Sequence, residues 1–222
     1  GLELLGWRDV PVDNTTIGKT ARSVEPVIKQ VFVGAGPSVK DQLAFERRLY
    51  CVRKRSAWGV RRAGLNENNE SFYACSLSSK TLIYKGQLMA PQLESYYIDL
   101  QDPNMVSALA LAHSRYSTNT FPSWGRAQPF RYIAHNGEIN TVRGNKNWMN
   151  ARESMFESPS FDDINMILPV IAPGGSDSAD FDQALEMLFL TGRSLPHVMM
   201  MMIPEPWSGH ETMGDDKRGF YE

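Results

Sequence analysis

Strand-like and helix-like segments of this sequence occur in separate runs rather than in regular alternation. Strand-like patterns cover 28–33, 71–88, 95–100 and the start of 107–118. Helix-like composition or spacing covers 38–62, 145–156 and 177–195. A parallel sheet built from βαβ units requires strands and helices to alternate, so this order predicts an α+β fold. A chain of 222 residues without repeats or linkers fits one large domain or two small ones.

Several local features make these expectations more specific. Residues 2–13 read as the end of a helix, a break at Gly6 and a short strand that Pro11 closes. The alternating segment 71–88 reads as a β-hairpin that turns at 78–79, and Ser38 can cap the helix over 38–62. Asp177 or Ser178 can cap the helix over 177–195, whose apolar residues recur at helical spacing at Phe181, Leu185, Leu188 and Phe189.

Composition excludes several classes of function. The net charge of −2 argues against a protein that binds mainly nucleic acid or an anionic membrane. Residues 47–62 hold seven Arg or Lys and no acid, and a solvated helix face is the favoured interpretation over a nucleic-acid patch. No apolar run approaches the ~18 residues of a membrane span, and two cysteines favour a reducing compartment over a disulfide framework. The four histidines are too scattered to predict a metal site.

Three short polar groups interrupt the apolar segments: HSRYST (113–118), HNGEIN (135–140) and GGSDS (174–178). Arg115 carries a guanidinium fork that suits a carboxylate, and Asp177 can accept from an ammonium group. Together they complement a zwitterionic amino acid. Asn136 and Gly137 add a side-chain amide and an unhindered backbone N–H, and two such donors directed at one point form an oxyanion hole.

Each of these residues also has a purely structural interpretation. Arg115 and Asp177 can form an ion pair that only holds the fold together. Asp177 can serve only as the cap of its helix. Asn136-Gly137 is also the dipeptide most typical of a two-residue hairpin turn, because both residues tolerate positive φ. Residue types alone leave these alternatives open.

The exact order of residues along several stretches is far more specific than these residue types. The stretch HSRYSTNTFPSWGRAQPFRYIAHNGEINTVRGNKNWMNARE (113–153) closely resembles the class-II glutamine amidotransferase domain of glutamate synthase large subunits. Further matches are GWRDVP, FYACSLSSKTLIYKG, GSDS and SLPHVMMMMIPEPW. The resemblance therefore covers the chain from end to end and implies that 1–222 is part of a single domain. It implies the N-terminal-nucleophile hydrolase fold, an αββα sandwich, here incomplete at both ends.

The resemblance also implies roles for individual residues. Asn136 and Gly137 match the oxyanion-hole pair of the family. Arg115 matches the residue that binds the α-carboxylate of L-glutamine, and Asp177 matches the residue that binds its α-amino group. Tyr116 and Thr118 match positions that line the substrate in related amidotransferases. These roles agree with the earlier inference from residue types, that Arg115 and Asp177 together suit a zwitterionic amino acid.

One departure from the family concerns the nucleophile. In the family it is a cysteine at the mature N-terminus, whose own α-amine is the base, whereas this sequence begins Gly1-Leu2. We therefore expect a fragment that lacks the nucleophile and is inactive alone. Cys51 lies in a basic helix that can lower its pKa, but nothing places its thiol near Asn136. Cys75 lies in a strand of aromatic and small residues, where a buried, inert thiol is expected.

The resemblance implies a larger enzyme around this domain. Ammonia from glutamine would serve the reductive amination of 2-oxoglutarate in other domains of the same polypeptide. FMN, an iron–sulfur cluster and either ferredoxin or a reduced-nicotinamide-dependent small subunit would serve that step, and none of these cofactor sites is expected in this segment. The implied location is the cytoplasm, or the plastid stroma in a photosynthetic eukaryote. A non-catalytic module that binds an amino acid is the alternative function.

Overall fold

The computed structural model of the chain describes residues 1–65, 71–116 and 121–222. Its strands are β1 (Leu2–Asp9) and β2 (Lys29–Ala35). Its α-helices are α1 (Lys19–Ser23), α2 (Gln42–Arg62), α3 (Gln92–Tyr96), α4 (Val142–Glu153), α5 (Asp177–Leu190), α6 (Leu195–Met202) and α7 (Asp215–Tyr221). Short 3-10 helices cover Asn14–Thr16, Ile98–Gln101 and Ile164–Ile167. The fold thus mixes helix and strand, in agreement with the α+β prediction.

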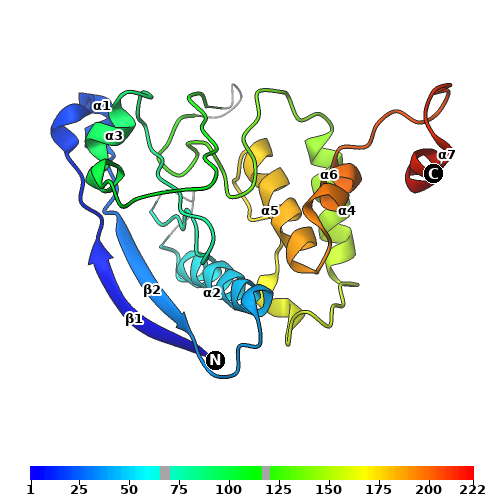
Figure 1. The fold of residues 1–222 in the computed structure, drawn as a ribbon, viewed down its shortest axis with the longest axis horizontal. Coiled ribbons are helices and arrows are strands. Elements are labelled where there is room, and N and C mark those ends of the chain that lie inside the picture. Colours follow the sequence, from blue (N-terminus) through cyan, green and yellow to red (C-terminus); the bar gives the residue numbers. More distant parts are fainter. Residues whose placement is uncertain (66–70, 117–120) are drawn as a thin grey trace.

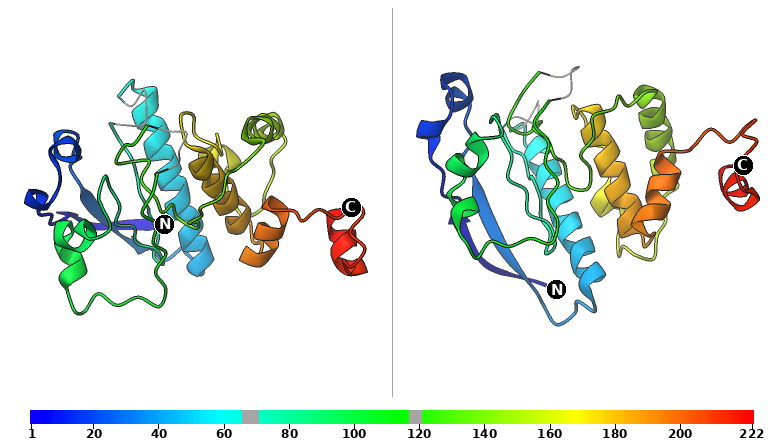
Figure 2. Two further views of the ribbon diagram at one scale, coloured as in Figure 1. Left: turned by 90° about the horizontal axis from the view of Figure 1, so that it is seen from above. Right: turned by 45° about the horizontal axis from the view of Figure 1, so that its top comes forward.

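The elements lie one after another along the long axis of the molecule, although not in chain order, since α3 lies beside α1 (Figure 1). The β1–β2 ribbon lies at one end, and α2 lies beside β2. Helix α5 follows, with α4 and α6 on its far side, and α7 lies at the opposite end. The two rotated views in Figure 2 keep the same order. Helices α2 and α5 therefore occupy the middle of the molecule, where most of the chain can pack against them.

Strands β1 and β2 form an antiparallel ribbon in which Leu2 pairs with Ala35 and Asp9 with Lys29. The strand expected at 28–33 is confirmed as β2, shifted by one or two residues. The helix end expected within 2–13 is wrong, because β1 is already a strand at Leu2. The Leu-Glu-Leu-Leu composition favours a helix, but pairing with β2 satisfies the backbone of this segment and outweighs that weak preference.

The three long helices expected from the sequence are all present, with different ends. Helix α2 begins at Gln42, and its cap is Asp41, whose carboxylate accepts from the backbone N–H of Ala44 at 2.8 Å, rather than the expected Ser38. Helix α4 begins three residues earlier than expected. Helix α5 ends at Leu190 because Gly192 adopts a positive φ of 102°, a backbone conformation that stops helices and favours glycine.

A hydrophobic core fills the space between α2 and α5. Tyr50 of α2 and Leu190 of α5 are 2% and 1% exposed, and Ile167 and Val170 from the segment between α4 and α5 are fully buried. Full burial of each such aliphatic side chain contributes about 1.5–3 kcal/mol to the hydrophobic free energy of folding. This core fixes the spacing of the two central helices.

A second core joins the end of β1 to α1 and α3. Tyr96 and Tyr97 meet edge to face with ring centroids 4.8 Å apart, and Tyr96 also lies 5.5 Å from Trp124. The strand expected at 95–100 is wrong, because the segment forms the end of α3 and a 3-10 helix. Only Tyr97 makes a strand-like bridge, to Val12. The aromatic and β-branched residues of 95–100 are typical of strands. In the structure, however, the tyrosine rings are buried by packing against other aromatic rings.

The hairpin expected at 71–88 is also wrong. Side chains from other segments occupy the backbone carbonyls that a hairpin would use: Arg131 donates to Ala74 O at 2.8 Å, and Tyr97 donates to Lys85 O at 2.7 Å. Lys85 is itself 5% exposed and donates to the carbonyls of Gly125 and Ala127 at 2.9 and 2.8 Å. A backbone carbonyl needs a hydrogen-bond donor, but that donor need not be the N–H of a neighbouring strand. Here side-chain donors take the place of the hydrogen bonds between the two strands of a hairpin.

The buried strand expected at the start of 107–118 is likewise absent from the structure. Val106 and Leu109 are 86% and 76% exposed, and no strand is assigned over 105–116. An apolar run is buried only when a second surface covers it, and the described residues place none there. The β1–β2 pair is also the one sheet among the described residues, so the αββα sandwich implied by the resemblance is not confirmed.

Helix α5 buries three carboxylates, and each has a cationic partner from a different segment. The partners come from α2, from the segment before HNGEIN and from α4. The pairs are Glu186–Arg53, Asp182–Arg131 at 3.6 Å and Asp180–Lys146 at 2.7 Å. Removal of one partner leaves a charge buried without compensation, which is strongly destabilising.

We predict that Arg53→Met lowers the free energy of unfolding by about 3–5 kcal/mol, because it leaves Glu186 buried and unpaired. The measurement is urea unfolding followed by circular dichroism. Arg62→Met is the matched control, since Arg62 lies exposed at the end of the same helix and stacks on Trp58; it should cost less than about 1 kcal/mol. The double variant Arg53→Met/Glu186→Leu should recover most of the loss. A double variant as unstable as the single one would contradict the role of the unpaired charge.

Candidate functional site

Two hydrogen bonds join the three polar segments that the sequence singles out. His113 Nε2 lies 2.6 Å from the carbonyl oxygen of His135. His135 Nε2 in turn lies 2.7 Å from the hydroxyl of Ser178. The segments HSRYST, HNGEIN and GGSDS are therefore neighbours in space, although 55 residues separate the first from the last.

The two bonds of His113 define its protonation. Its Nδ1 accepts from the backbone N–H of Arg115 at 3.1 Å, so Nε2 must carry the hydrogen that is donated to the His135 carbonyl. That carbonyl belongs to the same planar peptide unit as the N–H of Asn136. A neutral His113 therefore ties the backbone at Arg115 to the peptide that leads into Asn136-Gly137.

Asp177 is the first residue of α5 rather than its cap. The cap is Ser176, whose hydroxyl accepts from the backbone N–H of Ala179 at 3.2 Å, so the expectation of Asp177 or Ser178 at that position is wrong. Asp177 Oδ1 accepts from the backbone N–H of Ser178 at 2.7 Å. A carboxylate in the first turn also lies at the positive end of the helix dipole, which stabilises its charged form.

The Gly174-Gly175 pair explains how the chain enters α5. Gly174 has φ of +78°, which disfavours residues with a side chain. A Cβ on Gly175 would lie 2.6 Å from Oδ1 of Asp180, too close for any larger residue without movement. Both glycines are therefore required to bring Ser176 and Asp177 to the start of the helix.

Arg115, Asn136 and Gly137 lie on the surface. All three are exposed, and no ion pair joins Arg115 to Asp177 within the described part of the chain, so the purely structural interpretation of that pair is not seen. Gly137 forms a bend, and neither it nor Asn136 is among the positive-φ residues. The dipeptide is thus not the two-residue hairpin turn that its composition allows.

Tyr116 is half-buried and has a clear structural contact. Its hydroxyl donates to the carbonyl of Gly86 at 3.1 Å, and burial raises its pKa to about 12, which keeps this donor protonated at neutral pH. The bond anchors the HSRYST segment to the 71–88 segment. Thr118, the other residue expected to line the substrate, lies outside the described residues.

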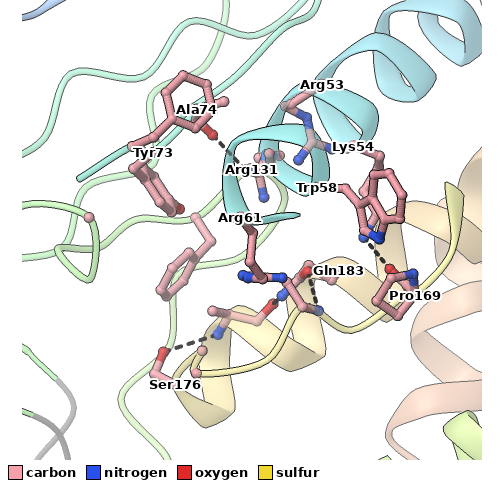
Figure 3. Close-up of a pocket in the computed structure, with 18 of the residues that line it drawn as sticks. Arg53, Lys54, Trp58, Arg61, Tyr73, Ala74, Arg131, Pro169, Ser176 and Gln183 are labelled. Atoms are coloured by element: carbon pink, nitrogen blue, oxygen red, sulfur yellow. Dashed lines mark hydrogen bonds between the residues drawn. The ribbon is translucent and has the colours of Figure 1, made fainter. Parts of the chain in front are cut away.

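A pocket that the sequence did not predict lies behind the Gly174–Ser176 segment (Figure 3). Its volume is about 100 Å³, and its walls come from α2, α5 and the segments 72–74, 125–131 and 168–176. Arg53, Lys54 and Arg61 of α2 line it, which corrects the expectation that 47–62 is only a solvated helix face. The sequence signal was the run of basic residues itself, but composition does not distinguish an exposed cation from a buried one.

Two negative findings complete the description of the site. Among the described residues, no group of three His, Cys, Asp or Glu side chains is arranged to hold a metal ion. Across the same residues, no helix is both long enough and apolar enough to cross a membrane.

Comparison with known proteins gives a consistent assignment. Residues 1–222 match the family model for class-II glutamine amidotransferases. The chain is 52% identical over 224 residues to the glutamate synthase [NADPH] large chain of Bacillus subtilis, and 48% identical over 229 residues to the glutamate synthase [NADH] of Schizosaccharomyces pombe. It is 43% identical over 216 residues to the ferredoxin-dependent glutamate synthase 1, chloroplastic/mitochondrial, of Arabidopsis thaliana.

These alignments include 100%, 100% and 96% of this chain but only 14%, 11% and 13% of the respective relatives. The chain thus spans about one-seventh or less of their length. Because the family model matches every residue of the chain, the chain belongs to the class-II glutamine amidotransferase family.

Proposed function

We propose that this chain is the glutamine-hydrolysing part of a glutamate synthase large chain. The observation that carries the proposal is the pair of hydrogen bonds from His113 to His135 and from His135 to Ser178. These bonds bring together the three segments that hold the proposed substrate residues. The family match and the glutamate synthase relatives support the same function.

Within this function we assign each polar group one task. Arg115 binds the α-carboxylate of L-glutamine through its planar fork, and Asp177 binds the α-ammonium group. The amide of Asn136 and the backbone N–H of Gly137 stabilise the oxyanion that forms when the side-chain amide is attacked. Tyr116 and Thr118 line the substrate. Exposure of Arg115 and Asn136 is compatible with these tasks, because both must meet a ligand that arrives from solvent.

The proposed nucleophile is the N-terminal cysteine of the family, and neither internal cysteine takes its place. Burial raises the pKa of Cys51 to about 11, with a smaller contribution from the nearby Asp162, so its thiol is protonated at neutral pH. This finding corrects the expectation that its basic surroundings lower that pKa. A thiol is a poor nucleophile compared with a thiolate. Cys75 is a half-buried free thiol.

The remaining proposals concern the complete enzyme. The full domain would form the αββα sandwich, with further strands beyond β1 and β2. Ammonia would aminate 2-oxoglutarate in other domains that carry FMN and an iron–sulfur cluster. Electrons would come from ferredoxin or a reduced-nicotinamide-dependent subunit, as the names of the matched relatives indicate for those proteins. The cytoplasm, or the plastid stroma in a photosynthetic eukaryote, would be the location.

We expect the chain to bind L-glutamine and Arg115→Lys to weaken that binding by about tenfold or more, because a point charge replaces a bidentate fork. Isothermal titration calorimetry with glutamine gives the dissociation constants. Arg193→Lys is the control, since Arg193 is exposed and contacts only the nearby Thr191 among the described residues. Absence of glutamine binding by the unsubstituted chain would contradict the proposed substrate site.

In the complete enzyme, Asn136→Ala should lower kcat for glutamine hydrolysis by roughly 10²–10³, with a much smaller change in KM. The reason is that the amide of Asn136 is used mainly in the transition state. Steady-state ammonia release over a range of glutamine concentrations separates the two constants. An effect on KM alone would show that Asn136 binds the substrate and does not form the oxyanion hole.

The 222-residue chain itself should release no ammonia from glutamine. Loss of the nucleophile from an acyl-transfer site leaves only ~10³–10⁴-fold acceleration over water, too little to detect for an amide. The assay is ammonia release by the purified chain, with Cys51→Ser and Cys75→Ser as controls. Turnover that either substitution abolishes would identify an internal cysteine as the nucleophile and overturn the assignment.

A further inference from the structure

The pocket between α2 and α5 is distinct from the proposed glutamine residues. None of Arg115, Asn136, Gly137 or Asp177 lines it. It adjoins them through the Gly174–Ser176 segment and through α5, which begins at Asp177. Figure 3 shows Arg53, Arg61 and Arg131 gathered near one another, with Lys54 and Trp58 toward Pro169. The function of this pocket is therefore a separate question from that of the substrate site.

The charge around the pocket is strongly one-sided. Five cationic side chains are among the described residues that line it, and none of these lining residues is Asp or Glu. Arg53 and Arg131 are paired with Glu186 and Asp182, which lie outside the lining. For Lys54 and Arg126, two further lining cations, the described part of the chain provides no ion pair.

Lys54 and Arg126 supply the surplus positive charge. Lys54 donates to the carbonyls of Pro169 and Val170 at 2.6 and 2.8 Å. Arg126 makes longer bonds to the carbonyls of Phe121 and Gly174, at 3.3 and 3.5 Å. A carbonyl dipole satisfies a donor but does not cancel its charge, so the pocket retains positive potential that favours an anion.

Two buried N–H groups in the walls have no acceptor. Nε of Arg53 and Nε of Arg131 are both inaccessible to solvent and donate no hydrogen bond within the described part of the chain. Arg53 is 5% exposed, and the Arg131 side chain is 11% exposed. Buried donors of this kind are rare in folded proteins and require an explanation. The walls around these two guanidinium groups therefore hold more hydrogen-bond donors than acceptors.

Much of the remaining wall is apolar, although Ser176 and Gln183 also line it. Trp58, Phe72 and Phe130 line the pocket together with Leu168 and Ala172. An inorganic anion such as phosphate would leave this surface without a partner, whereas a ligand with a hydrocarbon body would cover it. The volume of about 100 Å³ restricts the ligand to a small molecule.

We propose that this pocket binds a small organic carboxylate, with its charged end near Lys54 and the arginines and its apolar body against Trp58 and Phe130. The ligand is a separate molecule from the glutamine bound through Arg115. It would contact the Gly174–Ser176 segment, which leads into the first turn of α5.

The protonation of Lys54 is consistent with such a ligand. Burial, together with a smaller effect of the neighbouring Arg53, lowers its pKa to about 7. The other charges that bear on it are Glu186, Arg131 and Glu153, of which the two carboxylates act in the opposite direction. A bound anion favours the ammonium form and raises the pKa again. Binding at pH 8 should therefore be accompanied by uptake of a proton.

The test is isothermal titration calorimetry of the 222-residue chain with benzoate and with benzamide, which has the same shape without the charge. Benzoate should bind and benzamide should bind at least about tenfold more weakly, since it lacks charge-assisted hydrogen bonds. Titrations at pH 8 in buffers of different ionisation enthalpy should reveal proton uptake with benzoate. Equal binding of the two compounds would overturn the proposal in favour of a purely apolar cavity.

Variants locate the binding site. Lys54→Met and Arg126→Gln should each weaken benzoate binding by about tenfold, and Arg62→Gln, at the exposed end of the same helix, should change it less than about twofold. Circular dichroism checks that each variant is folded. Arg115→Gln should also leave benzoate binding unchanged; a loss there would place the anion at the glutamine residues and overturn a separate site. Failure of benzoate to bind would reject this pocket without affecting the glutamine titration described above.

Discussion

The fold depends on the three carboxylates that α5 carries into the interior of the protein. Asp180, Asp182 and Glu186 are at most 6% exposed, and burial raises the pKa of Asp180 and Asp182. Charges in such places are tolerated only with partners, and the partners come from α4, from the segment before HNGEIN and from α2. Helix α5 can therefore occupy the middle of the molecule only when three separate parts of the chain are in position around it. Apolar packing alone is less selective, because many hydrophobic surfaces are interchangeable.

The same helix organises the proposed site from its first turn. Ser176 caps it, Asp177 begins it, and Ser178 contacts the ring of His135. One turn further on, the backbone N–H of Tyr132 donates to Asp182 at 2.7 Å, so the segment that leads into Asn136 is held at two points along α5. A loop that carries catalytic groups is commonly positioned by a rigid element beneath it. Here that element is a helix whose buried charges already fix its place.

The sequence predicted helices well and strands poorly, for a physical reason. The helix over 177–195 is recognised from apolar residues three and four positions apart, and those over 38–62 and 145–156 from their composition. In each case the signal is contained in the segment itself. A strand needs a partner from elsewhere in the chain. Among the described residues, the segments 71–88, 95–100 and 107–116 pair with no strand, apart from the single bridge between Tyr97 and Val12. The proposed site residues come from a specific motif, and their roles stay predictions. The pocket was missed because burial of Arg53 and Lys54 depends on Pro169 and Glu186, more than 100 residues away.

The β1–β2 ribbon leaves two edges of backbone donors and acceptors unused among the described residues. Leu4, Leu5 and Trp7 of β1 are also more than 60% exposed, so the ribbon presents apolar side chains as well as open edges. A sheet of two strands is marginally stable in water and gains from every strand that is added to it. The ribbon is therefore a template for sheet growth. Any strand that pairs with it extends the sheet, and at high protein concentration copies of the chain would compete for the same edges.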